Sequence, residues 1–560
     1  MEKLKKLLTS LLFCALGFVA FSQSEHYAQP AFPYHATAEE QQMLKTWYKN
    51  VKDGPAPTAP VTAIAEFQPM GGVMVSYPLG IPVNLVSELS FITKVKVLVY
   101  PASDSNTVKT YFAASGVNMD NVSFWVINHD SYWTRDYGPW FIIDGNDQVG
   151  VVDFTYNRPA RPNDDAALVQ VANLLQMQRY EMPMVHTGGN YMVDGYGTAA
   201  STTLLLEENP NQTSTSLQTM ANQYLGINNY MLLDDPLGDY IEHIDCWGKF
   251  LDVDKVLIAK VPSSDPRYSD YEAVANTFAN ALTPWGNHYQ VFRVNAPGRD
   301  NTTPFTNSLI LNDHVFVPVA GTQYDNAAIA VYQQAMPGYT IVPIMQNNNR
   351  PWQNTDALHC RTHELADPEM LYIKHYPLLG EYDLPTATTI HAEIKALGGQ
   401  SLVCDSLLVY YRVNGGTWQT TRLELVSGGG FEASLTGLQA GDEVDYYLFA
   451  QDQSGRRECH PYIGAADPHH FKVLTVGVED VATSNAIAIY PNPCSRYFVV
   501  NCPKTAQSIE VFDITGSLVF STRNCEDRVV VGTSDWKSGI YLVKIVDKSG
   551  NVHNRKVVKR

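Results

Sequence analysis

Three short segments of the sequence carry a cysteine, a histidine and two aspartates whose chemistry could be complementary. Cys360 lies in the stretch Asn354-Thr-Asp-Ala-Leu-His-Cys360-Arg-Thr-His363, and two upstream segments are Trp133-Thr-Arg-Asp136 and His243-Ile-Asp245. In an extended strand His243 and Asp245 would lie on one face, because side chains repeat every two residues. One could act as an acid or base while the other binds a cation. A thiolate, an imidazole and two carboxylates suggest attack on a positively charged planar carbon, and the guanidinium of arginine is the obvious biological candidate.

The same residue types also suggest how such an attack would proceed. A cysteine is only a small fraction thiolate at neutral pH unless an imidazolium or another positive charge lowers its pKa. His243 could do this, give its proton to a departing nitrogen, and then activate the water that resolves a covalent adduct. Asp136 and Asp245 would hold a guanidinium by charge-assisted hydrogen bonds.

Each of these residues also has a structural explanation. A lone cysteine is often a packed small hydrophobe, His243 could be a structural donor, and Asp136 could form a surface ion pair with its neighbour. Cys246, next to Asp245, is expected on the opposite face as a core residue. A set of Cys, His and Asp residues could also bind a metal ion. The sequence has neither Cys-x-x-Cys nor His-Glu-x-x-His, so we expect no metal and no cofactor.

Length and charge narrow the class of protein. The chain has 560 residues, so two to four domains are expected. Its formal net charge of -18 disfavours nucleic acid or an anionic membrane as the main partner.

Residues 1–22 combine three lysines, an apolar run and an Ala-Phe-Ser end, which predicts a signal peptide. No later run is apolar enough for a transmembrane segment. Seven of the eight cysteines follow the leader; this odd number leaves at least one unpaired, and Cys360 is the candidate.

From about residue 95 to residue 360 the sequence repeats one plan of strand, helix, strand and polar motif. We expect five such units, the third of them with a strand over residues 202–206, a helix near 214–224 and a strand over 229–233. Polar segments beyond the ends of strands are typical of sites in α/β proteins. The pattern predicts a five-bladed α/β propeller with a central site, and an open α/β sheet is the alternative.

The composition shifts to short alternating strands after about residue 382. Segments such as residues 407–413 and 444–450, with glycine-rich turns between them, predict a β-sandwich, in which Cys404 and Cys459 could form a bridge. A further all-β segment begins near residue 486. Residues 23–50, which are polar with one helical stretch near residues 39–51, are expected to be a pro-segment or linker.

In order along the chain, the motifs Trp133-Thr-Arg-Asp136-Tyr-Gly-Pro, Gly188-Gly-Asn190, His243-Ile-Asp245, Phe305-Thr-Asn307 and Asn354 to Cys360 resemble those of guanidine-modifying deiminases. The resemblance is specifically to bacterial Porphyromonas-type peptidylarginine deiminases, and agmatine deiminases are similar in the same motifs. It covers about residues 60 to 370. It implies a five-bladed α/β propeller, an immunoglobulin-like domain and a C-terminal sorting domain of the type IX secretion system, the last suggested by Pro491-Asn-Pro493, Gly539-Ile-Tyr and the basic terminus.

With the resemblance, the expected domains acquire boundaries. We expect a signal peptide over 1–22, a pro-segment or linker over 23–50, the deiminase catalytic domain over 51–375, the immunoglobulin-like β-sandwich over 376–475 and the sorting domain over 476–560. The sorting domain would be an address rather than part of the catalyst, because the catalytic motifs are complete by Cys360.

The resemblance also implies a role for each site residue. Cys360 would be the nucleophile, His243 the acid/base, Asp136 and Asp245 the guanidinium ligands, and Asn307 a supporting residue. The residues expected to line the substrate pocket are Trp133, Tyr240, Ile241 and Thr355. The family holds the substrate's carboxylate with an Arg-Pro-Arg segment, which Asn157-Arg158-Pro-Ala-Arg161 matches with one extra residue, so Arg158 is the expected contact and the role of Arg161 stays open.

The expected function is that of an exported cysteine hydrolase, a peptidylarginine deiminase. It would convert arginine, preferably at peptide C-termini, to citrulline and ammonia through a covalent thiouronium, with arginine-containing peptides, proteins and free arginine as substrates. Type IX secretion machinery would carry it through the periplasm of a Gram-negative bacterium to the medium or the outer-membrane surface. The alternatives are an agmatine deiminase and a non-catalytic surface adhesin.

Overall fold

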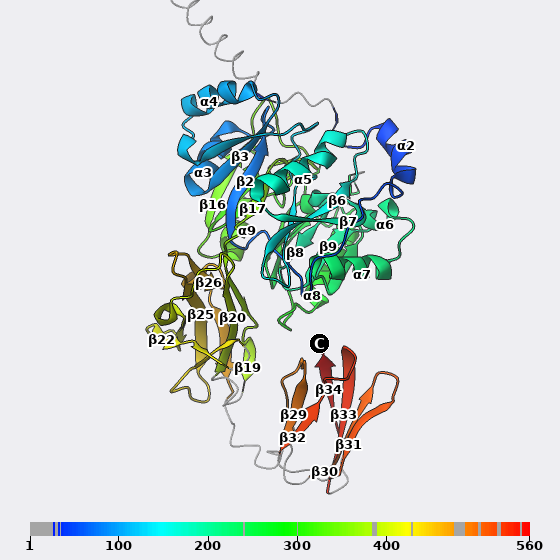
Figure 1. Ribbon diagram of the computed structural model, residues 1–560, viewed down its shortest axis with the longest axis vertical. Helices are drawn as coiled ribbons and strands as arrows, with labels where there is room; N and C mark the ends of the chain where they lie inside the picture. Colours follow the sequence, from blue (N-terminus) through cyan, green and yellow to red (C-terminus); the bar gives the residue numbers. More distant parts are fainter. Residues whose placement is uncertain are drawn as a thin grey trace, which may run out of the picture. The chain divides into compact units, whose positions relative to one another are not determined.

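The computed structural model describes residues 26–27, 32–33, 35–238, 241–298, 301–382, 389–426, 429–474, 488–501, 506–523, 528–548 and 552–560. The predicted signal peptide and Tyr240 lie outside these residues. The described residues fall into two compact units, of which the first ends at Leu474 and the second comprises those from residue 488 onward (Figure 1). No helix within the described ranges is long and apolar enough to cross a membrane.

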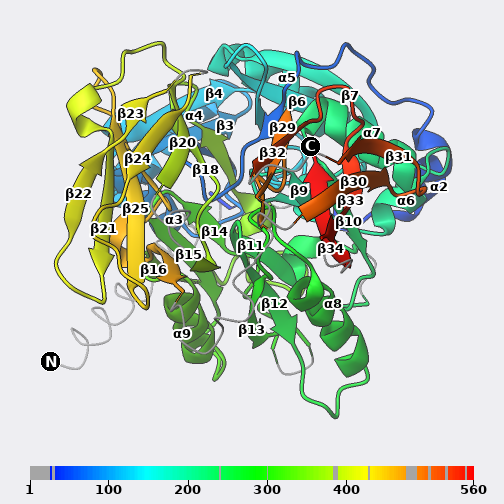
Figure 2. The ribbon, with the colours of Figure 1, turned by 90° about the horizontal axis from the view of Figure 1, so that it is seen from below.

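Among its described residues, the first unit begins with a part that contains five small mixed sheets. Each sheet has a parallel pair of strands bridged by helix, flanked by an antiparallel strand. In Figure 2 the bridging helices α8 (Tyr268–Asn280) and α9 (Asp325–Ala335) lie on the outer side of their sheets. The described part thus has the mixed α/β class that the sequence predicts.

The first sheet is assembled from segments far apart in the chain. Its parallel strands are β2 (Met70–Ser76), β3 (Lys94–Val99) and β4 (Val122–Val126), connected by the helices α3 (Val83–Ile92) and α4 (Asp104–Ala114). Strand β17 (His363–Ala366) pairs antiparallel with β2 and so completes this sheet. The segment around Cys360 is thereby attached to the beginning of the five-sheet part.

The other four sheets of this part follow one another along the chain. The second has β1 (Thr62–Ala63), β5 (Trp140–Ile143), β6 (Val149–Tyr156), α5 (Pro162–Leu175) and β7 (Gln178–His186). The third has β8 (Met192–Val193), β9 (Thr198–Thr202), α6 (Leu204–Glu208), α7 (Ser214–Leu225) and β10 (Asn229–Leu233). The fourth has β11 (Gly248–Asp252), β12 (Lys255–Lys260), α8 and β13 (Gln290–Asn295), and the fifth has β14 (Leu309–Leu311), β15 (His314–Val319), α9 and β16 (Thr340–Met345).

Four of the predicted strand-helix-strand units are confirmed, and the third is wrong in its first strand. The strand lies at Thr198–Thr202, whereas residues 204–206, which were expected to be extended, belong to helix α6. The run Leu204-Leu-Leu206 is apolar, and a short apolar run cannot be assigned to strand or helix by its periodicity. The actual strand is composed of small residues that give no β-branched apolar pattern.

Burial explains why these strands form where they do. All eight residues of β6 are buried, as expected of a parallel strand covered on both faces. The buried apolar residues of the five sheets form two large clusters, one around Trp247, Phe278 and Tyr332 and one around Leu85, Phe112 and Phe316.

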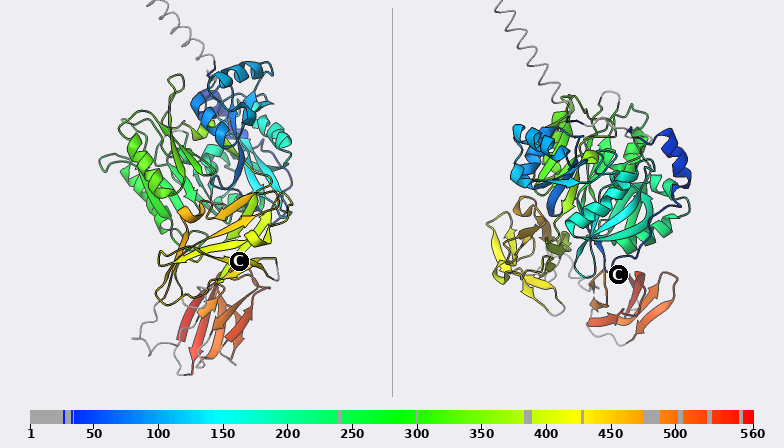
Figure 3. Two further views of the ribbon diagram at one scale, coloured as in Figure 1. Left: turned by 90° about the vertical axis from the view of Figure 1, so that its left-hand side faces the viewer. Right: turned by 45° about the horizontal axis from the view of Figure 1, so that its top comes forward.

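The first unit continues into a β-sandwich, drawn in yellow in Figure 3. One sheet has β18 (Leu371–His375), β20 (Thr389–Ala396), β24 (Phe431–Ser434) and β23 (Glu424–Leu425); the other has β19 (Gly380–Tyr382), β27 (His469–Val473), β25 (Glu443–Gln451), β21 (Leu408–Val413), β22 (Gln419–Arg422) and β26 (Arg457–His460). Both sheets contribute to one core. The predicted sandwich strands are confirmed, but Cys404 and Cys459 are both free, so the possible bridge between them is absent from the described structure.

The second unit is all-β over its described residues, as predicted. Its strands are β28 (Ala488–Tyr490), β29 (Tyr497–Asn501), β30 (Ala506–Asp513), β31 (Leu518–Thr522), β32 (Arg528–Gly532), β33 (Gly539–Asp547) and β34 (Val552–Lys559). They form two sheets, with a core that includes Phe498, Val543 and Val557.

The segment that the sequence suggests as a pro-segment or linker packs on the five-sheet part. Helix α2 (Ala38–Trp47) begins with a capping box between Thr37 and Glu40. Its last residue, Trp47, donates from Nε1 to the carbonyl of Tyr156 at 3.0 Å, and the following Lys52 forms an ion pair with Asp153 at 2.7 Å. This attachment brings the N-terminal segment close to Arg161, as described below.

Three histidines are buried where the sandwich meets the five-sheet part. The hydroxyl of Tyr196 lies 2.7 Å from His460 Nε2, and His460 Nδ1 lies 2.9 Å from His469 Nε2. The hydroxyl of Tyr446 lies 2.9 Å from His375 Nε2. Burial lowers the pKa of His375 to about 4 and the pKa values of His460 and His469 well below the ordinary 6.5. The folded state therefore holds these imidazoles neutral.

We expect the free energy of unfolding of the first unit to decrease as the pH falls below 6.5, the ordinary histidine value. The unfolded chain takes up protons there, whereas folded His375 resists protonation until about pH 4. The stabilisation is complete above the pKa of the unfolded histidine. It is lost as the pH falls toward the pKa of the folded histidine, at about 1.4 kcal/mol per pH unit for each histidine. Urea unfolding at about pH 7.5 and about pH 5.5 measures the loss.

Replacing His460 by glutamine should make this loss smaller, because one buried imidazole no longer titrates. The matched control is His391→Gln, since the His391 side chain is exposed. An identical loss of stability in wild type and His460→Gln would contradict the explanation.

Candidate active site

Cys360 lies in the short 3-10 turn η4 (His359–Arg361), just before strand β17. Asn307 contacts it twice: Asn307 Nδ2 donates to Cys360 Sγ at 3.1 Å, and the Cys360 amide donates to Asn307 Oδ1 at 3.3 Å. The carbonyl of Cys360 accepts the amide of Arg135 at 3.2 Å. These bonds and the pairing of β17 with β2 fix the thiol in position.

Asp136 and His243 face each other across the glycine pair Gly188-Gly189. His243 Nδ1 lies 3.6 Å from Asp136 Oδ1. A Cβ atom on Gly189 would lie 2.5 Å from His243 Nδ1 and 2.8 Å from Asp136 Oδ1, and one on Gly188 would lie 2.0 Å from the carbonyl oxygen of Arg135. Both positions require glycine because a methyl group has no room there.

Asp245 reaches the same place from a turn. The extended conformation in which His243 and Asp245 would share a face is present only at His243, because Ile244–Cys246 form the 3-10 turn η3. Asp245 Oδ2 lies 3.7 Å from Cys360 Sγ, so the turn still aims this carboxylate at the thiol. The turn satisfies its own backbone locally, since the amide of Cys246 bonds to the carbonyl of His243.

The same turn changes the position of Cys246. This residue is buried as predicted, but it does not point away from Asp245: its Sγ lies 3.5 Å from Asp245 Oδ1. Its thiol also contacts the thiol of Cys360. Strict alternation of faces holds only in a strand, so it fails in a 3-10 turn.

Several predicted site residues have buried polar atoms without a hydrogen-bond partner among the described residues. These atoms are Trp133 Nε1, Asp136 Oδ1, Arg158 Nε, Thr355 Oγ1 and both ring nitrogens of His243. Leaving such an atom unpaired costs about 1–3 kcal/mol, so a concentration of them is a reason to look for a ligand site. The group offers both donors and acceptors.

Burial sets the charge of the central groups. Burial and the neighbouring Asp245 raise the pKa of Asp136 to about 7, and burial lowers the pKa of His243 to about 3. Contact with Cys246 acts to lower the pKa of Cys360, but burial and the nearby carboxylates outweigh it and raise that pKa to about 11. Burial alone would raise the pKa of Asp245, yet the hydrogen bond and charge of His359 outweigh burial and lower it. At neutral pH the protein therefore holds a thiol, a neutral imidazole and one firmly ionised carboxylate.

Arg158 and Arg161, the predicted carboxylate ligands, have different surroundings. Arg158 is buried and donates to the carbonyl of Asn157 at 3.1 Å, while its Nε has no partner within the described structure. Arg161 bonds to Glu40 of the N-terminal segment, from Nε to Oε1 at 3.2 Å. Its guanidinium also lies 5.1 Å from the ring of Trp133. The two arginines thus approach the same site, but Arg161 already holds a carboxylate.

The remaining predicted pocket residues are placed as follows. Thr355 is buried, and its carbonyl oxygen lies 3.9 Å from Cys360 Sγ. Trp133 packs with Tyr132 against Cys360. Ile241 is buried in the segment that leads to His243. The structure therefore brings together Cys360, Asn307, Asp136, His243, Asp245, Trp133, Thr355 and the two arginines.

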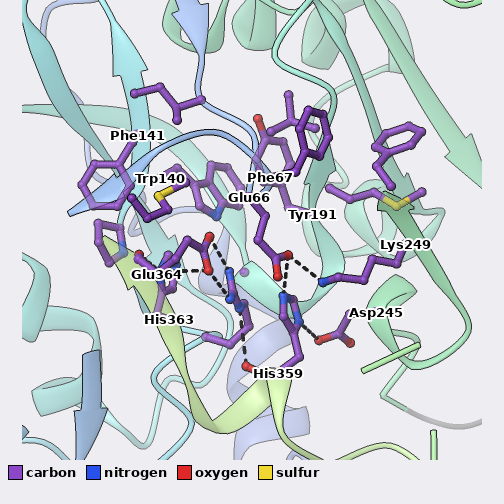
Figure 4. A pocket seen from close by; sticks show the side chains of 18 of the residues that line it. Glu66, Phe67, Trp140, Phe141, Tyr191, Asp245, Lys249, His359, His363 and Glu364 are labelled. Atoms are coloured by element: carbon purple, nitrogen blue, oxygen red, sulfur yellow. Dashed lines mark hydrogen bonds and ion pairs between the residues drawn. The ribbon is translucent and has the colours of Figure 1, made fainter. Parts of the chain in front are cut away.

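The charged residues that lie next to Asp245 on the side away from the thiol were not identified from the sequence. A cavity of about 50 Å³ has Glu66, Lys249, His359 and Glu364 in its lining. Figure 4 labels these four side chains. His359 stood inside the quoted cysteine motif and could have been noticed as the neighbour of the nucleophile. Glu66 gave no signal, because it is a single carboxylate in the segment Ile64-Ala-Glu-Phe67. No group of three or more His, Cys, Asp or Glu in the described ranges is arranged to hold a metal ion.

Comparison with known proteins identifies the family of the chain. Residues 81–365, which are half of the chain, match the family described as Porphyromonas-type peptidyl-arginine deiminase, and residues 488–560 match a secretion system C-terminal sorting domain. An agmatine deiminase of Pseudomonas putida is 24% identical over 268 residues, which cover 41% of this chain and 73% of that protein.

Solved structures of similar proteins include two agmatine deiminases. That of Enterococcus faecalis is 20% identical with a TM-score of 0.48, covering 57% of this chain and 98% of that chain. That of C. jejuni is 18% identical with a TM-score of 0.45, covering 55% and 96%.

The match at the C-terminus indicates an exported protein with a type IX sorting domain. The match over residues 81–365 contains every motif from Trp133 to Cys360 that forms the site. The chain belongs to the Porphyromonas-type peptidyl-arginine deiminase family, whose members, like the related agmatine deiminases, are hydrolases that modify guanidino groups.

Proposed function

We propose that this protein is a peptidylarginine deiminase that hydrolyses the guanidinium of arginine to citrulline and ammonia, with Cys360 as the nucleophile. The observation that carries the proposal is the position of the Cys360 thiol. It is bonded to Asn307 at 3.1 Å and lies 3.7 Å from Asp245, within a site that also holds Asp136 and a neutral His243.

Binding would begin with the charge of the substrate. A guanidinium held between Asp136 and Asp245 replaces the positive charge that the site lacks, and this favours the ionised form of both Asp136 and Cys360. His243, neutral before binding, accepts the thiol proton. The sulfur of Cys360 then attacks the central carbon of the guanidinium, and a carbon–sulfur bond forms.

The covalent intermediate is then formed and resolved. His243 returns the proton to the departing nitrogen, the carbon–nitrogen bond breaks, and ammonia leaves a thiouronium on Cys360. A water molecule gives a proton to His243 while its oxygen bonds to the same carbon. The carbon–sulfur bond breaks, the thiolate recovers a proton and citrulline is released, with the second proton of the water carried away on ammonia as ammonium.

For the architecture we propose that the five sheets are the blades of an α/β propeller closed by the pairing of β17 with β2, and that the sandwich is immunoglobulin-like. We also propose the predicted domain limits: a signal peptide over 1–22, a pro-segment or linker over 23–50, the catalytic domain over 51–375, the sandwich over 376–475 and the sorting domain over 476–560. We propose delivery through the periplasm to the outer-membrane surface or medium of a Gram-negative bacterium, which the match to a sorting domain supports.

We expect Cys360→Ala to lower citrulline formation from a peptide ending in arginine by at least about a thousandfold, because the variant has no group to form the covalent intermediate. Citrulline and ammonia are measured together. Cys459→Ala is the matched control, since Cys459 is also a free cysteine but lies in the sandwich.

Turnover by Cys360→Ala close to that of wild type would disprove the mechanism. If wild type released no ammonia from excess arginyl peptide, the chain would instead be a binding protein such as an adhesin.

We further propose that the preferred substrate is a C-terminal arginine, whose carboxylate Arg158 binds. Agmatine has no carboxylate, so a buried arginine at the far end of its pocket would stay unpaired. Charged hydrogen bonds of this kind contribute about 1.5–3 kcal/mol each, which corresponds to about tenfold to more than a hundredfold discrimination.

The test compares kcat/KM for a peptide ending in arginine, the same peptide amidated, and agmatine, in wild type and Arg158→Ala. The free acid should be preferred at least about tenfold by wild type and lose that preference in the variant. Equal values for the free-acid and amidated peptides in wild type would rule out the carboxylate contact and favour agmatine or internal arginine.

A further inference from the structure

A line of charged side chains continues from Asp245 into the protein, away from the thiol. His359 Nδ1 lies 2.8 Å from Asp245 Oδ2, and His359 Nε2 lies 3.1 Å from Glu66 Oε2. Lys249 Nζ lies 2.6 Å from the same Glu66 oxygen. Figure 4 shows these four side chains in sequence, with their contacts drawn as dashed lines.

One charge state of His359 satisfies all of its contacts. Both of its ring nitrogens lie within hydrogen-bond distance of carboxylate oxygens, which can only accept, and a histidine donates from both nitrogens only as the imidazolium. The four groups then alternate in sign, from Asp245 through His359 and Glu66 to Lys249. Glu66 is tied further by its other oxygen, which accepts the amide of Ile310 at 2.7 Å.

The two proposed guanidinium ligands, Asp245 and Asp136, differ in whether a partner lies behind the carboxylate. Asp245 has the imidazolium of His359 directly behind it, whereas Asp136 Oδ1 has no hydrogen-bond partner among the described residues. Accordingly the pKa of Asp245 is lowered despite burial, while burial and Asp245 raise the pKa of Asp136 to about 7. A difference of this kind gives the two carboxylates different states before a substrate arrives.

We propose that His359 and Glu66 are positioning residues that orient the Asp245 carboxylate and provide its counter-charge, so that one guanidinium ligand is ready before substrate binds. This inference rests on the proposed deimination. Neither residue touches the substrate in it; both act through Asp245. His359 also belongs to the turn of the nucleophile, and its amide donates to the carbonyl of Asn307 at 3.1 Å, so the same residue links the thiol and the carboxylate.

The pH dependence of kcat/KM distinguishes this role from a merely structural one. In wild type a single carboxylate, Asp136, should ionise near pH 7, so log kcat/KM should rise with unit slope on the acid side.

Other charged and titratable groups surround both carboxylates of the line. Those around Asp245 are His359, His243, Arg135, Asp136, Cys246 and Cys360, and those around Glu66 are Lys249, His359, Arg135 and Glu364.

Glu66→Gln keeps the shape of the side chain but removes the charge that stabilises the imidazolium. Asp245 should then resemble Asp136 and require deprotonation as well, so the acid slope should increase from one toward two and kcat/KM near neutral pH should fall about tenfold, mainly through KM. Glu66→Asp, which keeps the charge, should retain the unit slope. Asp194→Asn removes another buried carboxylate of the five-sheet part and serves as the control.

His359→Gln provides a second variant, with thermal unfolding as the check that each protein is folded. A slope and KM equal to wild type in folded Glu66→Gln and His359→Gln would overturn the positioning role while leaving deimination intact. Absence of Cys360-dependent citrulline in wild type would instead remove the proposed function itself.

A separate observation concerns Arg161 and the N-terminal segment. Arg161 pairs with Glu40 through Nε and through Nη2 at 3.2 and 3.5 Å, and Nη2 also donates to the carbonyls of Pro33 and His35 at 2.8 and 3.2 Å. Its guanidinium lies between the rings of Phe32 and Trp133, at 5.2 and 5.1 Å. Glu40 is wholly buried.

The pairing of Arg161 with Glu40 has the chemistry of an arginine bound to a peptide carboxylate. Arg161 shares Trp133 with the site, and its charge acts on Asp136. We infer that Glu40 occupies the place of a substrate carboxylate, so that displacing the segment around α2 adds Arg161 to the contact made by Arg158. This second inference also rests on the proposed preference for C-terminal arginine.

The Glu40→Ala variant of the full chain tests the inference that Glu40 occupies the place of a substrate carboxylate. We expect kcat/KM for the free-acid peptide to rise at least about fivefold and that for the amidated peptide to stay constant, since only the free acid gains a charged contact. The gain should vanish in Glu40→Ala/Arg161→Ala. The control is Glu39→Ala, an exposed carboxylate of the same helix.

A free-acid rate that does not rise in Glu40→Ala, or a rise shared by the amidated peptide, would overturn the inference about Glu40. If neither wild type nor Glu40→Ala distinguished the free acid from the amide, the proposed C-terminal preference would fail instead.

Discussion

The site depends on burying two carboxylates side by side next to a thiol. Asp136 and Asp245 repel each other and both lose hydration, so an unaided pair would take up protons and lose its affinity for a cation. His359 lies 2.8 Å from Asp245, whose pKa is lowered despite burial, whereas the pKa of Asp136 is raised to about 7. In the proposed reaction a bound guanidinium supplies the missing positive charge, and the neutral ureido group of citrulline removes it again. Binding of the cation, activation of the thiol and release of the product would then depend on the same shortage of positive charge.

The fold delivers the necessary residues by repeating one connection. Each of the five sheets has an antiparallel strand that follows a polar motif: Asp136 precedes β5, Gly188-Gly189 precede β8, Asp245 precedes β11, Asn307 precedes β14 and Cys360 precedes β17. These short turns satisfy much of their backbone locally, which allows buried polar side chains to project from them. Close packing explains why positions 188 and 189 are glycines. A Cβ atom on Gly188 would collide with the carbonyl oxygen of Arg135, and one on Gly189 would collide with His243 and Asp136.

The recurring part of this plan was predictable from the sequence, and the long-range part was not. The helices and strands of four units and the strands of the sandwich follow from patterns within short windows. The expectation that Cys360, His243 and Asp136 act together came from their chemistry and from the family resemblance. The run Leu204-Leu-Leu206 misled because apolarity alone does not select strand or helix. Asp245 lies in a 3-10 turn and not in an extended segment, yet its carboxylate still lies close to the thiol of Cys360. Glu66 could not be predicted, since its partner His359 is 293 residues away and a lone buried carboxylate has no sequence signature.

The two ends of the proposed substrate are held by different kinds of structure. The proposed guanidinium ligands Asp136 and Asp245 lie in turns inside the five-sheet core, and Asp245 is also linked through His359 and Glu66 to Lys249. The arginines for the far end lie on the connection after β6, where Arg161 is tied to a segment that packs from outside through Glu40, Trp47 and Lys52. If Glu40 occupies the place of a substrate carboxylate, as we infer, changes in that outer segment alter the charge available to the substrate's carboxylate while leaving the thiol and its carboxylates in place. The proposed substrate selection would then depend in part on an outer segment, whereas the proposed chemistry depends on the five-sheet core.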